Sequence, residues 1–387
     1  MDTQAALISR MDRLAHSRPG LFRARAIGTL ALGYAGAACL ALAPFGAATL
    51  GLLALRHTRA PLAAAPAALV LVLLAIWVAS RRSPAPGLPG ESIDAIEADG
   101  LHAMLTRLRC RLRVAYPREV RVTAQFDAAL FQDSNQGIFG RGAARSVLLL
   151  GLPLMKCLSE PQLEAVLAHE LGHLVGVNAA ATSRARHLQI ALQRLQGDLF
   201  RENGRPWRIL SRVLAWYLPR LEACTVVWAR ANETDADRVA AELTSPQLLA
   251  QALVAHAVVG EYWHRHYWRW VGQSTRELPP RLLCPYTSFN VAAFRAAPEE
   301  LRRQWLETAI RLDPGPTASH RSLWARIEAA GSLPELALPV PGRTADRLLR
   351  AECARLDALF DRRWREGTVA ARRLLHGLLH YPAGGAG

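Results

Sequence analysis

Two long apolar stretches dominate the first fifth of the chain. Residues 27–55 and 60–80 contain no charged side chain, and only the tetrapeptide Arg56-His57-Thr58-Arg59 separates them. A helix needs about 20 apolar residues to cross the hydrocarbon core of a bilayer, and both stretches reach that length. The pattern therefore predicts a transmembrane hairpin over 27–80. A pair of buried core helices is the alternative, although uncharged runs of this length are uncommon in soluble cores.

The residues that follow alternate between polar and apolar positions, as in a soluble domain. A Pro- and Gly-rich linker over 81–90 separates the hairpin from this domain, which we expect to span 91–331. The expected elements are listed in chain order: a helix over 91–112, a strand over 119–124, a Gly-rich turn over 136–142, a strand over 146–150 and mostly helices thereafter. This order predicts a mainly α fold with a small β-sheet, of the α+β class.

Two further segments carry weaker patterns. Residues 209–227 are fairly apolar but include Arg212, Arg220 and Glu222. Charges at the centre of a membrane helix are costly, so we interpret this segment as an amphipathic or core helix, with a membrane-dipping segment as the alternative. The region 332–387 is predicted to hold a Pro-rich linker, an amphipathic helix over 344–366 and a Gly-ended tail.

Charge adds an orientation to this picture. The chain carries a net charge of +15, and almost all of its positive charge is arginine, because Lys156 is the single lysine. The segment 1–26 is basic and precedes the first apolar stretch, which favours a cytoplasmic N-terminus and, after two crossings, a cytoplasmic remainder. The arginines are scattered without interleaved aromatics, so we expect an anionic bilayer rather than nucleic acid as a partner.

The cysteines point to the same compartment. The chain has six cysteines, none of them in a Cys-x-x-Cys pair. This usage is typical of reduced cysteines without a structural role, as in a cytoplasmic domain.

The candidate chemistry lies in the sequence Ala168-His169-Glu170-Leu171-Gly172-His173. Ser159 and Gln162 have capping-box spacing, so a helix is expected to begin just before it. Because one helical turn takes 3.6 residues, His169 and His173 project from the same face and can bind one ion. Glu170 lies beside them, where it can serve as general base. This combination is typical of a zinc peptidase.

Catalytic zinc usually has three protein ligands, so a third ligand is expected downstream. The best candidate is Glu233, in the segment Asn232–Ala241, which has a helical pattern over about 223–243. Asp237 lies four residues later on the same face, where it can accept a hydrogen bond from a ligand histidine. Taken alone, this segment is more often an ordinary charged helix face.

Together these motifs resemble those of the HtpX-like and CaaX-prenyl-protease-like integral-membrane zinc peptidases. The resemblance rests on the His169–His173 motif and on Glu233-Thr234-Asp235-Ala236-Asp237, which fits the family's Glu-x-x-x-Asp pattern. The segment Ser319–Ile327 also resembles the family's His-Pro-x-x-x-x-Arg-Ile element, with Arg321 in place of the proline. The similarity covers roughly 91–331 and the preceding hairpin. Members of the family generally carry further membrane segments between the two motifs, and none is evident here.

The resemblance implies a glutamate-type zincin fold (a gluzincin) that holds one Zn²⁺ per chain. It implies His169, His173 and Glu233 as zinc ligands, Glu170 as general base and Asp237 as a partner of a ligand histidine. It also places His320 or Arg326 near the substrate or beside the ligands. The implied location is the cell membrane, of the bacterial inner-membrane type, with protein substrates that include membrane proteins.

The resulting hypothesis is a membrane-anchored zinc metalloendopeptidase. The strand over 146–150, with Val147, Leu148 and Leu149, is expected either to present an open edge to an extended peptide or to be plain core. Two rivals stay open. One is a non-enzymatic membrane scaffold with a structural or lost zinc site and a basic cytoplasmic domain that binds lipid or a partner, and the other is a metal hydrolase with a non-peptide substrate. A structural site usually has four ligands, mostly cysteines, and would not require Glu170.

Overall fold

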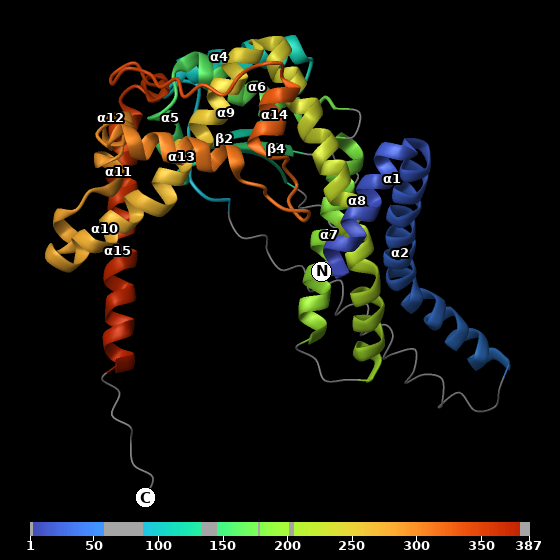
Figure 1. Ribbon diagram of the computed structural model, residues 1–387. Helices are drawn as coiled ribbons and strands as arrows, with labels where there is room; N and C mark the ends of the chain where they lie inside the picture. The colour runs from blue at the N-terminus through green and yellow to red at the C-terminus, as the bar shows by residue number, and fades with distance from the viewer. Residues whose placement is uncertain (1–2, 58–87, 134–144, 177–178, 201–204, 380–387) are drawn as a thin grey trace, which may run out of the picture.

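The computed structural model describes residues 3–57, 88–133, 145–176, 179–200 and 205–379. Helices predominate around one small sheet, which confirms the expected α+β class (Figure 1). The sheet and the helices packed on it form one end of the molecule. Two groups of helices extend from that end in the same direction, α1, α2, α7 and α8 on one side and α15 on the other.

The sheet has four strands in the order β1-β2-β4-β3. Their bounds are β1 Glu91–Ser92, β2 Glu119–Thr123, β3 Ala128–Asp133 and β4 Arg145–Gly151. β2 and β4 run parallel, with Val122 opposite Leu150, whereas β3 runs antiparallel to β4, with Leu130 opposite Leu148. Leu148 and Leu150 are fully buried, as a strand in the interior of a sheet requires.

The strand expected over 146–150 is confirmed as β4, but its expected open edge is wrong. β4 pairs with β2 on one side and with β3 on the other, so the sheet already flanks Val147, Leu148 and Leu149 on both sides. An unbroken apolar run is typical of such an interior strand. The strand at that end of the sheet is instead β3, which the sequence pattern did not reveal.

The helix expected over 91–112 begins later than predicted. It is α4, Asp99–Leu112, and the residues before it form β1 and a turn. The Asp94 carboxylate accepts hydrogen bonds from the backbone N–H groups of Ile96 (2.8 Å) and Glu97 (2.9 Å). Such a turn competes with helix formation, which explains the later start.

One core joins the sheet to the helices that carry the candidate motifs. It contains Leu105 of α4, Leu150 of β4 and Leu167 of α6 (Glu160–Gly172). The region after residue 331 belongs to the same core through Leu356 and Phe360 of α15 (Glu352–Leu379). The amphipathic helix expected over 344–366 is therefore displaced toward the C-terminus. Its first turns are replaced by the 3₁₀ helix Ala345–Leu349 and by Arg350, which has a positive φ of 50°.

A second core lies among the long helices α1 (Thr3–Ser17), α2 (Pro19–His57), α7 (Ala179–Phe200) and α8 (Arg205–Leu243). α8 includes the segment 209–227, and Leu214, Leu218 and Leu221 on one of its faces are buried in this core. The segment is therefore helical, with one face in a core, and its expected position outside the bilayer stays a prediction. The opposite face carries Ile209 and Trp216, which are 66% and 54% exposed.

The first expected membrane segment lies within α2, and the second lies outside the described residues. In the part of the chain that the structure describes, no helix is both long enough and apolar enough to traverse a bilayer.

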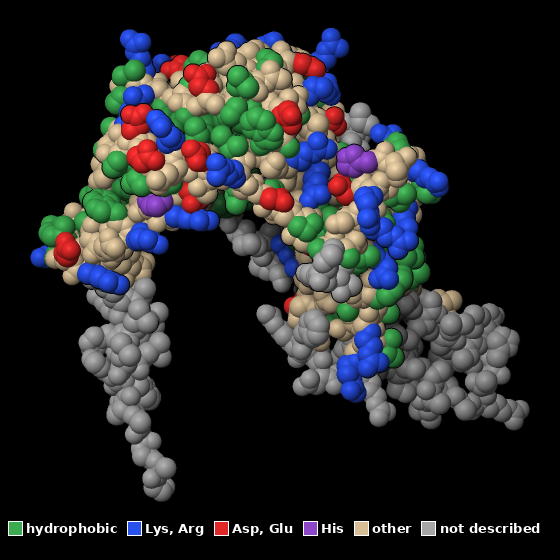
Figure 2. Space-filling view, in the orientation of Figure 1, with side chains coloured by type: hydrophobic (Ala, Val, Ile, Leu, Met, Phe, Trp, Pro, Cys, Tyr) green, Lys and Arg blue, Asp and Glu red, His purple; other side chains and the backbone are tan. Residues whose placement is uncertain are grey.

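A third core is aromatic and is built from the helices between the second motif and residue 331. Trp263, Phe289 and Phe294 are at its centre. The helices are listed here in chain order: α9 Pro246–Glu261, a π-helix Tyr262–Tyr267, α10 Trp268–Glu277, a 3₁₀ helix Pro280–Leu282, α11 Pro285–Ser288, α12 Val291–Arg295, α13 Glu299–Arg311 and α14 Leu323–Ala329. On the face shown in Figure 2, acidic and basic side chains intermingle over this part of the molecule.

A buried ion pair fixes α15 to the domain. Lys156 follows the short helix α5 (Leu152–Met155), and its Nζ donates to both carboxylate oxygens of Asp357 and, at 2.8 Å, to the Tyr286 carbonyl. Paired and fully hydrogen-bonded charges of this kind can be buried, whereas a lone ammonium cannot.

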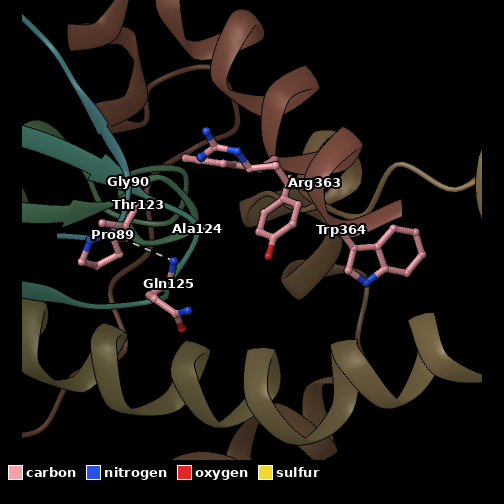
Figure 3. Close-up of a pocket in the computed structure, with 9 residues that line it drawn as sticks. Pro89, Gly90, Thr123, Ala124, Gln125, Arg363 and Trp364 are labelled. Atoms are coloured by element: carbon pink, nitrogen blue, oxygen red, sulfur yellow. Dashed lines mark hydrogen bonds between the residues drawn. The ribbon is translucent and has the colours of Figure 1, made fainter. Parts of the chain in front are cut away.

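A pocket of about 280 Å³ lies beside α15, against Thr123, Gln125, Tyr286 and Trp364 (Figure 3). Its lining includes none of the candidate site residues.

Gly151 ends β4 where a side chain would not fit. A Cβ there would collide with the Gln125 carbonyl oxygen and lie 2.8 Å from the carbonyl oxygen of Asp127. We expect Gly151→Ala to lower the free energy of unfolding by about 1–3 kcal/mol, as overpacking usually does. Gly272→Ala in α10, which meets open space, is the control and should be neutral or slightly stabilising. Denaturant unfolding of the purified chain measures both, and equal effects would contradict the packing argument.

Candidate metal centre

Helix α6 begins as its sequence predicts. The Ser159 hydroxyl accepts from the Gln162 N–H (3.4 Å), and the Gln162 side-chain oxygen accepts from the Ser159 N–H (2.9 Å). This capping box satisfies two backbone donors at the helix N-terminus. The Gln162 amide also donates to the Ala337 carbonyl at 2.6 Å, which ties the helix to the segment after α14. The start of the helix is thus fixed ten residues before the first histidine.

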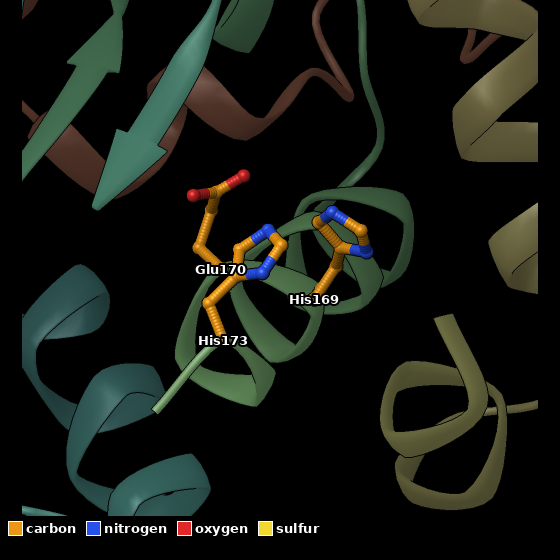
Figure 4. A group of neighbouring side chains, drawn as sticks. All are labelled: His169, Glu170 and His173. Atoms are coloured by element: carbon orange, nitrogen blue, oxygen red, sulfur yellow. The ribbon is translucent and has the colours of Figure 1, made fainter. Parts of the chain in front are cut away.

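His169, Glu170 and His173 lie together at the C-terminal end of α6 (Figure 4). One donor atom from each side chain lies within 4.8 Å of the other two. The two imidazole rings are 4.7 Å apart between centroids and nearly perpendicular, at 80°. Glu170 projects toward the sheet, where its Oε2 accepts a hydrogen bond from the Leu130 N–H of β3 at 2.8 Å.

Helix α8 brings Glu233 to the same place. One Glu233 oxygen lies 3.5 Å from His169 Nε2, and the other lies 3.5 Å from His173 Nε2. The two helices approach closely because Gly172 has no side chain: a Cβ there would lie 3.1 Å from the Cα of Ala236. Glu233 and His169 are both buried, at 8% exposure. The structure thus assembles all three residues that the sequence predicted as ligands.

This donor set fits zinc. Two imidazole nitrogens and one carboxylate are the ligands of many catalytic zinc sites. Ligand atoms bonded at about 2.0–2.1 Å to a tetrahedral ion lie roughly 3.3 Å apart. The spacing of 3.5 Å between each Nε2 and its Glu233 oxygen is close to that value. His169, His173 and Glu233 could therefore hold one zinc ion with little rearrangement.

Asp237 and Arg326 position His169 from the side of its Nδ1 atom. His169 Nδ1 lies 2.9 Å from Asp237 Oδ1, so the carboxylate holds the ring with Nε2 toward Glu233. Arg326 of α14 donates two hydrogen bonds to the same carboxylate, one of 2.9 Å from Nε and one of 2.7 Å from Nη2. The bidentate pair fixes the orientation of the carboxylate. Both residues therefore lie where the sequence analysis expected them.

Asn232 was missed by the sequence analysis. Its side-chain amide lies against Nδ1 of His173, with Nδ2 at 3.1 Å. The amide oxygen and nitrogen exchange places when the amide turns by 180°, and the turned oxygen would accept from Nδ1–H and leave Nε2 free for a metal. Asn232 thus does for His173 what Asp237 does for His169. Only its position next to Glu233 could have suggested this.

His320 also reaches the centre. It lies in the irregular segment between α13 and α14, and its Nδ1 is 2.9 Å from Glu233 Oε2. Its side chain is 58% exposed, in contrast to the buried residues around it. The substitution of Arg321 for the proline of the family pattern does not prevent this approach.

The two histidines of the centre differ in pKa because they have different neighbours. Burial alone would lower the pKa of His169, but its contacts with Asp237 and Glu233 outweigh this effect and raise the pKa to about 9. Burial opposes ionisation of Glu233, yet His169 and His320 hold its pKa well below the usual range. Burial, with repulsion from His169, lowers the pKa of His173 to about 4. The carboxylates thus stabilise a proton on His169, whereas His173 is neutral near pH 7, the form in which an imidazole can bind a metal.

Burial raises the pKa of Glu170 to about 7, against the attraction of His169 and the hydrogen bond from Leu130. A buried carboxyl group with a pKa near neutrality beside a candidate metal centre is typical of a functional site rather than a surface ion pair.

Comparison with known proteins agrees with this geometry. The sequence profile of peptidase family M48 matches residues 101–332, which is more than half of the chain. The chain belongs to peptidase family M48. The matched region contains α6, α8 and α14, and therefore every residue of the centre described above.

The chain is also similar to proteins named as HtpX proteases. The chain is 27% identical over 189 residues to the "Protease HtpX homolog" of Nostoc punctiforme, covering 46% of this chain and 63% of that protein. It is 32% identical over 173 residues to "Protease HtpX homolog 2" of Methanosarcina mazei, covering 41% and 55%. The chain thus spans less than two thirds of the length of these relatives. No solved structure matches it significantly.

The Asp237 contact generates a prediction about metal affinity. We expect Asp237→Asn to weaken zinc binding by about 10–100-fold, because the ligand histidine loses its anionic partner. Asp235→Asn is the matched control: it lies on the same helix, and its ion pair among the described residues is with Arg238, at 3.7 Å. Competition with a chromogenic chelator measures both affinities. Equal affinities for the two variants would remove Asp237 from the centre.

Proposed function

We propose that this chain is a zinc-dependent metalloendopeptidase. The observation that carries the proposal is the convergence of His169, His173 and Glu233 from two helices, with Glu170 beside them and bound to the sheet. Zinc held by the first three residues would supply Lewis acidity that activates water and polarises the peptide carbonyl. Membership in family M48 supports a peptidase rather than another hydrolase.

Glu170 acts as the general base in this proposal. The Leu130 N–H holds its Oε2, which fixes the carboxylate on the side of the histidines that faces the sheet. Glu170 takes a proton from the attacking water and then donates it to the leaving amine. Glu170 is not one of the three proposed ligands, so the proposed ligand set does not depend on its ionised form.

The substrate would bind along β3. This strand pairs only with β4 in the described sheet, and its Leu130 contacts Glu170. An extended peptide could add to the sheet at this side, with backbone hydrogen bonds that place the scissile carbonyl next to Glu170. His320 is exposed and adjacent to Glu233, where it would stabilise the negative charge that develops on the carbonyl oxygen.

Attachment to a bilayer completes the proposal. The uncharged stretches over 27–55 and 60–80 are the anchor that we propose, and the basic residues over 1–26 favour a cytoplasmic catalytic part. Proteins of the same membrane would then be natural substrates.

The rival proposal is a membrane scaffold with a structural metal. A structural zinc site is usually closed by four ligands, mostly cysteines. Among the described residues, the side chains close enough together to hold a metal ion are those of His169, Glu170 and His173, and none of them is a cysteine. This composition favours catalysis.

Glu170→Gln tests the proposal. The amide cannot accept the proton, so we expect casein hydrolysis to fall by about 10³-fold or more while about one zinc per chain stays bound. Glu164→Gln on the same helix is the control: among the described residues Glu164 pairs with the exposed Arg107, and activity should not change. Initial rates and metal content are measured on detergent-solubilised protein. Zinc binding by a wild type that cleaves neither casein nor a membrane protein would favour the scaffold.

A further inference from the structure

The loop over 312–322 presents His320 to the metal centre but has little core of its own. It joins α13 to α14 without regular secondary structure, and it turns at Gly315, whose φ is +80°. The His320 side chain is more than half exposed, so packing does little to fix its approach to Glu233. Something else must hold this backbone in place.

The loop backbone is held by Arg230. Its Nε donates to the Ala318 carbonyl at 3.0 Å, and its Nη2 donates to the carbonyls of Pro316 (2.8 Å) and Gly315 (3.4 Å). Three carbonyls within four residues thus converge on one guanidinium, and the Arg230 side chain is only 16% exposed. The planar fork of arginine suits such a set of acceptors, whereas a lysine could not reach all three.

Arg230 also joins this loop to the N-terminal helix. It lies on α8 three residues before Glu233, so it belongs to the same side of the helix as the ligand. Its remaining nitrogen, Nη1, is 3.7 Å from Asp12 of α1. Helix α1 packs along α8, where Ile8 and Met11 are buried in the second core (Figure 1). One side chain therefore contacts the loop, the ligand helix and the helix that precedes the apolar stretch.

We propose that Arg230 is a positioning residue that holds the 312–322 loop, and through it His320, against the metal centre, with Asp12 of α1 as its anionic partner. The N-terminal helix then forms part of the catalytic apparatus as well as leading into the proposed anchor. The role assigned to His320 rests on the proposed peptidase function, whereas the attachment of the loop does not.

Hydrogen exchange tests the attachment without any assay of activity. In Arg230→Gln we expect the backbone amides of 312–322 to exchange at least about 10-fold faster, because the loop loses its tie to α8. Asp12→Asn should accelerate the same amides by a smaller factor. The control is Arg238→Gln, an exposed arginine on the same helix that pairs only with Asp235 and Glu242. Unchanged exchange in Arg230→Gln overturns the proposal, whatever the activity.

A double-mutant cycle tests the positioning of His320. We expect His320→Ala to lower kcat/KM by about 10²–10³-fold, as the loss of one oxyanion donor usually does. Arg230→Gln should lower it by at least about 10-fold with zinc content unchanged. The double variant should be no worse than His320→Ala alone, because Arg230 acts through His320. Arg230→Lys should recover only part of the loss.

Multiplicative losses in the double variant would overturn the positioning role, since Arg230 would then act independently of His320. Loss of zinc or a large drop in thermal stability in Arg230→Gln would also overturn it, in favour of a purely structural role. A wild type without peptidase activity refutes the proposed function and, with it, the catalytic role of His320. The exchange measurement still decides whether Arg230 holds the loop.

Discussion

The contact between α6 and α8 is the constraint on which the rest of the site depends. Each helix carries only part of a metal centre: two histidines on α6 and one carboxylate on α8. The carboxylate can contact both imidazoles only if the two backbones pack at short range, which Gly172 permits opposite Ala236. A leucine at that position would preserve the hydrophobic character of the interface and still separate the ligands.

Burial of the carboxylates at this centre is unfavourable in free energy, and contacts with positively charged side chains compensate for it. Glu233 and Asp237 are both less than 10% exposed, and an isolated carboxylate at such a position would be strongly destabilising. Asp237 is instead shared between His169 and a bidentate Arg326, so that α14 is fixed to α8. The pair of Lys156 and Asp357 follows the same rule for α15. Charged contacts thus determine where the later helices sit, while the apolar cores supply most of the stability.

The features that depend on nearby residues in the sequence were predicted correctly. The capping box set the start of α6, and the four-residue spacings placed His169 with His173 and Glu233 with Asp237 on common helix faces. β3 was missed because its residues, Ala128–Asp133, show no regular alternation of polar and apolar positions, although the predicted Gly-rich turn over 136–142 lies between it and β4. The expected open edge was therefore given to the wrong strand. The roles of Asn232 and Arg230 could not be predicted from the sequence either. Their partners, His173 and Pro316, are 59 and 86 residues away and are identified only by the packed fold.

Arg230 connects the metal centre to the N-terminal helix α1. A metal centre built only from α6 and α8 would be complete without the N-terminal helix. The loop that carries His320, however, is held by a guanidinium whose remaining nitrogen faces Asp12 of α1. Coupling between α1 and His320 through these few polar contacts requires an element that can adopt two distinct arrangements. The exposed 312–322 loop, which has little core of its own, is suited to be that element. The proposed anchor and the proposed chemistry are therefore linked by one arginine.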